Sequence, residues 1–331
     1  MKKTILTALI ALALAAAGPT AFARELALGG QVVGIQVSTA GVLVAGTGAV
    51  ETAEGSRSPA EEAGVHAGDV IVELGGRKVR DAGELIGAVA ALEGADAELT
   101  VLRGGKPLLL TLKPARSDEN KWMLGMWLRD GISGIGTVTF CDPATGLYGA
   151  LGHSISDTDS GAMLPMDEGS ITEAQIVSIK PGAAGAPGEL NGSADPGKVL
   201  GSIERNTDHG IFGHMNRPGG GRVVETGEIR TGPATILATV DGGKTREFSV
   251  RVSRIYRDGD GEHVMLSVTD PELCARTGGI VQGMSGSPIL QDGKLVGAVT
   301  HVFLSDPKRG YGISIQDMLD DAGAAEQAAY K

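Results

Sequence analysis

The chain has 331 residues, of which 52 are glycine and only 3% are aromatic, and its formal net charge is −11. This length allows two domains of ordinary size, and the glycine content favours tight turns and short strands over helical bundles. The acidic charge argues against a nucleic-acid partner.

Residues 1–23 have the features of a secretory signal peptide. Lys2 and Lys3 precede an apolar run from Ile5 to Ala17, and residues 21–23 supply a small-x-small cleavage signal. The run is shorter than the roughly 20 residues that a membrane span needs. We therefore expect export across the cytoplasmic membrane; the sequence leaves open whether the segment is removed or kept as an anchor.

A first domain is predicted over residues 25–115. It contains a short helix, a turn and a strand within Ser58–Gly76, then a helix over Ala82–Leu92 and two strands that meet at the turn Gly104–Lys106. The stretch Ser58–Gly76 resembles the signature of bacterial PDZ domains.

The PDZ resemblance implies a groove in which a peptide or protein C-terminus is added as a strand beside a helix. Backbone amides of a Gly-apolar loop would receive the terminal carboxylate. Gly34-Ile35, within Val32–Val37, is the predicted peptide-binding loop.

Asp118–Lys121 is polar and forms the predicted junction to a second domain. From Trp122 onward, short apolar runs alternate with turn signals such as Asp241–Gly243 and Asp258–Gly261. This spacing predicts an all-β barrel or sandwich, closed by a helix over Ile315–Ala329. Cys141 and Cys274 are interpreted as buried small residues, although one disulfide between them stays open.

The segment Gly283–Pro288 has the pattern Gly-x-Ser-Gly-x-Pro, the nucleophile turn of chymotrypsin-like serine peptidases. Its glycines allow a tight bend and a close approach of substrate. The amides of Gly283 and Ser285 are the predicted oxyanion hole. Ser287 is a competing nucleophile, disfavoured by the proline that follows it. The Gly-x-Ser-x-Gly elbow of α/β-hydrolases is excluded because residue 287 is serine.

A serine nucleophile needs a general base. His153 ends the apolar stretch Tyr148–Leu151 at a Gly-His corner with small residues on both sides. A histidine with room around its ring at the end of a strand suits this role.

Residues 152–157, 277–288 and 297–303 together closely resemble the stage IV sporulation protein B peptidases, and the match continues through residues 306–313. These are signalling serine endopeptidases of endospore-forming bacteria. The resemblance implies a PDZ domain (25–115) followed by a chymotrypsin-like two-barrel peptidase domain (118–331).

Carried over by this resemblance, the nucleophile is Ser285, the base is His153 and the acid is Asp270. Asp270 is closer to the serine than the acid usually is in chymotrypsin-like enzymes. Asp157 and Asp159 therefore stay as alternatives for the acid.

The remaining histidines predict no metal site. His209 and His214 lack an acidic or cysteine partner at the usual spacing, so we expect no metal and no cofactor. His301 lies on the strand that leaves the nucleophile hairpin. Our hypothesis is that it helps to recognise a polar or acidic side chain before the cleaved bond.

The resemblance implies a substrate and a compartment. The substrate would be a membrane-associated regulator of an intramembrane protease, cleaved between forespore and mother cell to trigger late sigma-factor activation, and the enzyme would also cleave itself.

Two alternatives stay open: a quality-control protease of the HtrA type, which carries its PDZ domain after the protease domain, and a catalytically silent PDZ scaffold.

Overall fold

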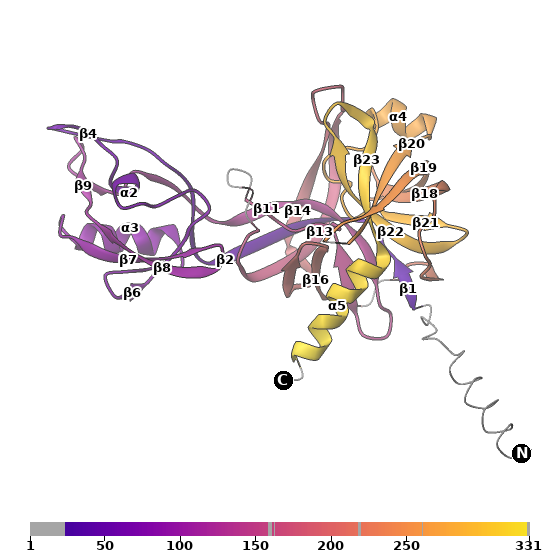
Figure 1. The fold of residues 1–331 in the computed structure, drawn as a ribbon, viewed down its shortest axis with the longest axis horizontal. Helices are drawn as coiled ribbons and strands as arrows, with labels where there is room; N and C mark the ends of the chain where they lie inside the picture. Colours follow the sequence, from indigo (N-terminus) through magenta and orange to yellow (C-terminus); the bar gives the residue numbers. More distant parts are fainter. Residues whose placement is uncertain (1–23, 158–160, 162, 218–219, 260, 330–331) are drawn as a thin grey trace, which may run out of the picture.

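The computed structural model describes residues 24–157, 161, 163–217, 220–259 and 261–329, so the predicted signal peptide (1–23) and Asp159 lie outside the described residues. Figure 1 shows a smaller body and a larger β-rich body, joined by the long strands β2 (Val32–Thr47) and β11 (Met126–Cys141). No helix in the described ranges is long and apolar enough to cross a membrane.

The smaller body is the PDZ domain. The second half of β2 begins a sheet that continues through β5 (Val70–Leu74), β7 (Ala97–Arg103) and β8 (Lys106–Leu112). The helix α3 (Ala82–Ala91) starts at its N-cap Asp81, whose carboxylate accepts a hydrogen bond from the Glu84 amide. The shorter elements are α2 (Pro59–Glu62), β3 (Val50–Thr52), β4 (Gly55–Arg57), β6 (Arg77–Lys78), β9 (Ala115–Arg116) and β10 (Trp122–Met123).

The larger body contains a first ring of six strands. β11 pairs with β2 and with β12 (Leu147–Ala150), and β12 pairs with β16 (Gly210–His214). On the other side, β2 pairs with β13 (Met166–Lys180), which pairs with β14 (Glu189–Ile203). A bridge between Gly201 and Met215 joins β14 to the end of β16 and closes the ring. β1 (Glu25–Leu28), β15 (Arg205–Thr207) and β17 (Val223–Glu225) extend it.

The second ring is a closed six-stranded barrel, and the predicted fold class is confirmed. Its strands are, in order around the barrel, β18 (Gly232–Thr239), β19 (Thr245–Arg257), β20 (Glu262–Val268), β23 (Asp306–Ser314), β22 (Lys294–Phe303) and β21 (Pro288–Gln291). The helix α4 (Pro271–Thr277) lies between β20 and β21 in the chain, and α5 (Ile315–Ala329) follows β23.

The strand pairing places the boundary between the two domains at a different position from the predicted one. The sequence predicts a PDZ domain over the whole stretch 25–115, yet β1 and the first half of β2 pair with strands of the first ring. The PDZ domain is therefore set into the first ring between β2 and β11, because each of these strands begins in one body and ends in the other.

The prediction of Gly34 and Ile35 as the PDZ peptide-binding loop needs correction. Both residues lie inside β2, between β11 on one side and β13 on the other. A Cβ added at Gly34 would lie 2.5 Å from the Cβ of Ala194 on β14. This glycine thus allows the close approach of a neighbouring strand, and Ile35 packs in the first ring.

Candidate active site

The predicted nucleophile lies on a turn that only glycine could build. Gly283 and Gly286, on either side of Ser285, have φ angles of +96° and +94°, in the left-handed region that L side chains rarely adopt. A Cβ added at Gly286 would lie 2.0 Å from the carbonyl oxygen of Thr137. Ser285 lines a cleft of about 800 Å³, and its Oγ donates a hydrogen bond to the Thr300 carbonyl oxygen at 2.6 Å.

The turn leaves two amides available at the cleft. Within the described part of the chain, the N–H groups of Gly283 and Ser285 have no hydrogen-bond acceptor. The carbonyl that precedes each of them is bonded: that of Gln282 to the Leu190 amide at 2.9 Å, and that of Met284 to the Ser287 amide at 3.0 Å. Because C=O and N–H point in opposite directions across a trans peptide, these bonds also orient the two free N–H groups.

The competing nucleophile Ser287 is inaccessible. Its side chain is fully buried and does not line the cleft. Its Oγ has no hydrogen-bond partner in the described ranges. The structure therefore favours Ser285 as the reactive hydroxyl.

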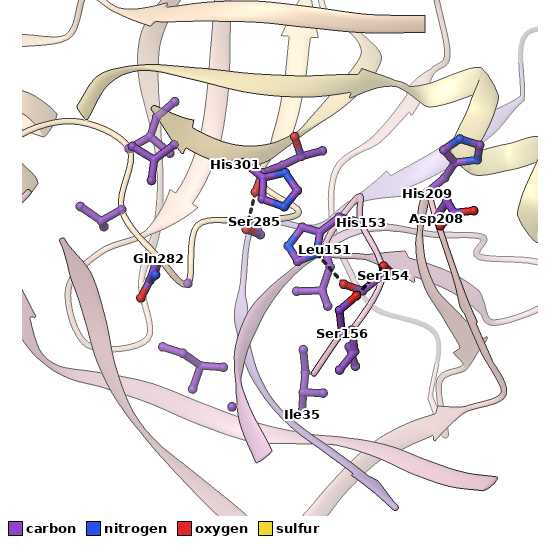
Figure 2. A pocket seen from close by; sticks show the side chains of 18 of the residues that line it. Ile35, Leu151, His153, Ser154, Ser156, Asp208, His209, Gln282, Ser285 and His301 are labelled. Atoms are coloured by element: carbon purple, nitrogen blue, oxygen red, sulfur yellow. Dashed lines mark hydrogen bonds between the residues drawn. The ribbon is translucent and has the colours of Figure 1, made fainter. Parts of the chain in front are cut away.

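The predicted base lies in the same cleft. A sharp corner at Leu151 and Gly152, with φ angles of +69° and +72°, turns the chain from β12 into His153. The His153 Nδ1 lies 2.7 Å from the Ser154 carbonyl oxygen, an acceptor, so Nδ1 carries the proton and Nε2 keeps its lone pair. Figure 2 shows Ser285, His153 and His301 next to one another.

The surroundings of His153 keep its ring neutral. Burial, and to a smaller degree the proximity of His301, lower the pKa of His153 to about 4. The two rings lie 4.5 Å apart between centroids, with a tilt of 34°. At neutral pH, His153 therefore has the unprotonated nitrogen that a general base requires.

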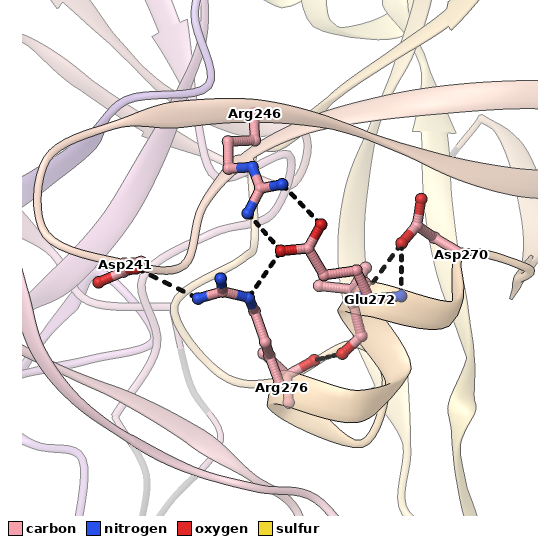
Figure 3. A network of polar contacts seen from close by, with 7 residues as sticks. Asp241, Arg246, Asp270, Glu272 and Arg276 are labelled. Carbon is pink, nitrogen blue, oxygen red and sulfur yellow. Dashed lines mark hydrogen bonds and ion pairs between the residues drawn. The ribbon is translucent and has the colours of Figure 1, made fainter.

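The predicted triad acid, Asp270, is placed elsewhere. It does not line the cleft; it is the N-cap of α4 and accepts hydrogen bonds from the amides of Glu272 and Leu273, at 2.9 and 3.0 Å (Figure 3). Its second oxygen accepts from the Ser249 amide at 3.2 Å. Although burial acts to raise the pKa of Asp270, these backbone bonds hold it below the usual value.

The alternative acid that the structure describes, Asp157, does not line the cleft. Asp157 is buried, lies 3.6 Å from the Arg129 guanidinium and does not line the cleft, and Asp159 lies outside the described residues. The described lining contains one carboxylate, the exposed Asp208. In this structure the partner of Nδ1 is the Ser154 carbonyl, a backbone group that side-chain patterns could not reveal.

The walls of the cleft are mainly apolar. The described residues that line it include no lysine and no arginine. The apolar lining residues are Ile35, Ile132, Ile135, Leu151, Ile155, Ile280, Val281, Val302 and Leu304. His301 also lines the cleft, and burial of part of its ring lowers its pKa. A neutral His301 among apolar walls gives little support to the predicted recognition of an acidic side chain.

The other candidate groups have structural partners. His209 bonds to Asp321 at 3.0 Å, and His214 bonds to Glu204 at 2.9 Å. Among the described residues, no group of three or more His, Cys, Asp or Glu is placed to hold a metal ion. Cys141 and Cys274 are not joined in a disulfide.

The PDZ edge next to α3 is the first part of β11. The Asp130 carboxylate accepts a hydrogen bond from the Ala82 amide at the start of α3 (2.6 Å), and Leu128 packs against the PDZ core. In the described chain, Met126–Arg129 pairs with β2 alone.

The loop that leads into this edge has the Gly-apolar character that the PDZ prediction required. Gly125 has a φ angle of +69°, and the amides of Leu124 and Gly125 have no acceptor in the described ranges. The Leu124 carbonyl is bonded to the Ala60 amide at 2.9 Å, which orients the Gly125 N–H away from that contact. Leu124–Met126 thus replaces Gly34-Ile35 as the candidate carboxylate-binding loop.

The comparisons identify the family. A family model of the SpoIVB peptidase S55 matches residues 120–319, and a PDZ domain model matches residues 32–113. The first match covers more than half of the chain, so the chain belongs to the SpoIVB peptidase S55 family and is a serine peptidase with a PDZ domain. A search of curated proteins gave no match.

Solved structures with some similarity include the Rv3671c protease from M. tuberculosis. Its active form is 15% identical, with a TM-score of 0.35, over 57% of this chain and 72% of that chain. Its inactive form is 13% identical, with a TM-score of 0.35, over 56% of this chain and 81% of that chain.

The variant Asp270→Asn tests the correction at Asp270. Asparagine is as good an N-cap as aspartate, but its amide nitrogen cannot accept from the Ser249 amide, so we expect a loss of about 1 kcal/mol of unfolding free energy and a rate of Ser285 labelling by a fluorophosphonate within a few-fold of wild type. Asp270→Ala, which also removes the cap, should lose about 2 kcal/mol of unfolding free energy. A triad acid would behave differently: Asp270→Asn would lower the rate by about 10⁴-fold.

The pH dependence tests the neutral state of His153. Because a general base must be unprotonated, the labelling rate should fall only as the pH drops through about 4, the lowered pKa of His153. In His301→Gln the midpoint should move to higher pH, since a protonated His301 no longer opposes protonation of His153. A wild-type midpoint near the ordinary histidine value of about 6.5 would contradict this assignment.

Proposed function

We propose that this member of the SpoIVB peptidase S55 family is a signalling endopeptidase of endospore formation. It cleaves a membrane-associated regulator of an intramembrane protease, and also itself, and so triggers late sigma-factor activation. The family membership supports the pathway. The observation that carries the enzymatic part is the cleft itself, where Ser285, two free backbone amides and a neutral His153 meet.

The proposed reaction begins when the Ser285 hydroxyl leaves the Thr300 carbonyl. His153 Nε2 takes its proton as Oγ attacks the substrate carbonyl carbon, and the oxyanion accepts hydrogen bonds from the Gly283 and Ser285 amides. The imidazolium is held through Nδ1–H by the Ser154 carbonyl. The C–N bond then breaks, the amine leaves with the proton from Nε2, and water repeats the sequence to release the acyl group.

The substrate segment that best fits the cleft is extended and apolar around the cleaved bond. The apolar lining, with no lysine or arginine among its described residues, favours this class over acidic side chains. A membrane-associated regulator offers such segments. In this proposal the His301 side chain is uncharged and forms part of the wall of the substrate-binding cleft.

The proposed role of the PDZ domain is to dock a partner C-terminus. Its terminal carboxylate binds the amides of Leu124 and Gly125, and its chain adds to the free edge of β11 beside α3. Ile86 on α3 is 63% exposed and supplies an apolar contact at this helix. The proposed compartment is the space between forespore and mother cell, reached through the signal peptide at residues 1–23.

A catalytically silent PDZ scaffold is the second candidate. Two observations favour it: the Ser285 hydroxyl is bonded to a carbonyl, and the Nδ1 partner of His153 is a carbonyl rather than a carboxylate. The HtrA-type alternative has less support, because its PDZ domain follows the protease domain.

Active-site labelling of the full chain with a fluorophosphonate tests the enzymatic proposal. We expect labelling of the wild type and of Ser287→Ala and none of Ser285→Ala. Ser287→Ala is a suitable control because its buried Oγ has no partner in the described chain, so its removal should cost little stability. An unlabelled wild type would favour the scaffold. Extensive digestion of unfolded casein would favour the quality-control alternative.

Binding of C-terminal peptides tests the PDZ assignment. Peptides from a C-terminal library should bind the full chain at least about tenfold more tightly with a free carboxylate than with an amidated end, because charged acceptors make stronger hydrogen bonds. Ile86→Glu should weaken binding, whereas Leu109→Glu, a matched exposed apolar residue on β8, should not. Equal binding of acid and amide would contradict the loop assignment.

A further inference from the structure

One peptide group holds the base of the active site in its orientation. The His153 Nδ1–H donates to the Ser154 carbonyl at 2.7 Å, a bond that Figure 2 shows. The N–H of the same peptide group belongs to Ile155, and it donates to the Asn206 Oδ1 at 2.7 Å. Because the C=O and N–H of a trans peptide point in opposite directions, the bond to Asn206 also sets the direction of the Ser154 carbonyl. Hydrogen bonds therefore run without interruption from His153, through one peptide, to Asn206.

The side-chain amide of Asn206 is bonded through both its oxygen and its nitrogen. Its Nδ2 donates to the Ile155 carbonyl at 2.8 Å and to the Leu164 carbonyl at 3.1 Å. The opposite assignment of oxygen and nitrogen would place the NH2 group against an N–H and the oxygen against two carbonyls. The surrounding bonds therefore fix Oδ1 on the side of the Ile155 amide.

Asn206 reaches the base from a neighbouring strand of the same sheet. It lies on β15, which pairs with β16, and β16 pairs with β12, the strand before His153. The turn after β15 contains His209, which lines the cleft and bonds to Asp321 of α5 at 3.0 Å. The hairpin that carries Asn206 is thus anchored by α5 as well as by its strand partner.

The bond to the Ser154 carbonyl favours the protonated state of His153. Burial and the proximity of His301 lower the pKa of the ring, whereas this bond acts to raise it. In the proposed reaction His153 becomes positively charged when it takes the Ser285 proton, so an acceptor at Nδ1 stabilises that charge. A carbonyl whose own peptide N–H is bonded is a stronger acceptor, because hydrogen bonds in series polarise one another. The bond to Asn206 therefore acts on the reaction step.

We propose that Asn206 is a positioning residue for the base: it orients the Ser154–Ile155 peptide, whose carbonyl keeps a proton on Nδ1 of His153 and leaves Nε2 to accept the Ser285 proton. The inference rests on the proposed function, since it concerns proton transfer during attack by Ser285. Asn206 thereby fills, through a peptide group, the orienting role that the acid has in a catalytic triad. It is not among the described residues that line the cleft.

Gln291 on β21 provides a matched control. The residue is 8% exposed, and its Oε1 accepts from the Arg230 amide at 2.9 Å. Its Nε2 donates to the carbonyls of Arg230 and Pro233, at 2.7 and 3.2 Å. This is the same set of three bonds that Asn206 makes, but Gln291 is not among the described residues that line the cleft. Asn206→Leu and Gln291→Met thus each remove one side-chain amide with three bonds to the backbone, with little change of side-chain volume.

The first measurement is inactivation of the full chain by a fluorophosphonate, split into kinact and KI. In this reaction the Ser285 Oγ forms a bond to phosphorus, the P–F bond breaks, fluoride leaves, and the proton passes to Nε2 of His153. Replacement of the aspartate of a serine-protease triad by asparagine lowers the rate by about 10⁴-fold. Because Asn206 orients a neutral carbonyl that stays in the chain, we expect a smaller loss in Asn206→Leu, with kinact about 10- to 100-fold lower and KI nearly unchanged. Gln291→Met should lose a similar resistance to urea but change kinact by less than about threefold.

Asn206→Asp separates the orienting bond from the two bonds that the side-chain NH2 group makes. Its carboxyl group keeps an oxygen for the Ile155 amide, but the NH2 group that donates to the Ile155 and Leu164 carbonyls is lost. We expect this variant to lose resistance to urea, as Asn206→Leu does, yet to keep kinact within about threefold of wild type. If Asn206→Leu does not fold, Asn206→Ala gives the same comparison.

The second measurement determines which ring nitrogen of His153 carries the proton. The ¹⁵N chemical shifts of the ring nitrogens, in the full chain labelled with ¹⁵N-histidine at neutral pH, distinguish the two neutral tautomers. The variant His153→Gln identifies the signals. We expect the Nδ1–H tautomer alone in the wild type, in Gln291→Met and in Asn206→Asp. Asn206→Leu should show both tautomers, because its Ser154 carbonyl is no longer held toward Nδ1.

The outcomes distinguish this inference from the proposed function. An unlabelled wild type would overturn the peptidase proposal, and with it the inference. A labelled wild type with equal kinact in Asn206→Leu and Gln291→Met would overturn the inference alone. A proton on Nε2 of His153 in the wild type, or the Nδ1–H tautomer alone in Asn206→Leu, would also overturn it, because the proposed role of Asn206 is to select the tautomer.

Discussion

The pairing of β2 with β11, which runs through both bodies with two register shifts, is the constraint on which the other features depend. The two strands pair from Thr47–Met126 in the PDZ domain to Val32–Thr137 in the first ring. Because side chains alternate along a strand, a slip of one residue would turn each inward side chain outward. The register of the regular part, Val32–Ser38 with Gly131–Thr137, therefore sets the cleft wall at Ile135 and the place where Thr137 meets the nucleophile turn. The PDZ edge belongs to the part of the ladder beyond the register shifts.

The site assembled on this ladder depends strongly on backbone groups. The Nδ1 of His153 is held by a backbone carbonyl, and the lowered pKa of the ring makes it a weak base. A weak base helps proton transfer less, since catalysis is most efficient when the pKa is near the working pH. In the proposed reaction, stabilisation of the oxyanion by the Gly283 and Ser285 amides would then supply more of the rate.

The sequence predicted the features that depend on local chemistry. The glycines around Ser285 and the corner before His153 are required by positive φ angles and close contacts, so the motif and the structure agree on these two residues. Asp270, predicted as the triad acid, also has a local signal for another role: an aspartate followed by Pro271 and Glu272 is a typical helix start. The capping bonds of α4 account for an aspartate at this position without a catalytic role.

Long-range pairing could not be predicted in the same way. A glycine beside apolar residues occurs both at Gly34 and at Gly125. The local sequence does not distinguish which of the two begins the strand at the edge of the PDZ sheet. The answer depends on partners far away in the chain: Gly34 is enclosed by Ile135 and Thr172, whereas in the part of the chain that the structure describes the stretch after Gly125 has a strand on one side only. The proposed docking edge and the cleft consequently share β11. Its first part lies beside α3, and its buried end is bonded to the nucleophile turn through Thr137.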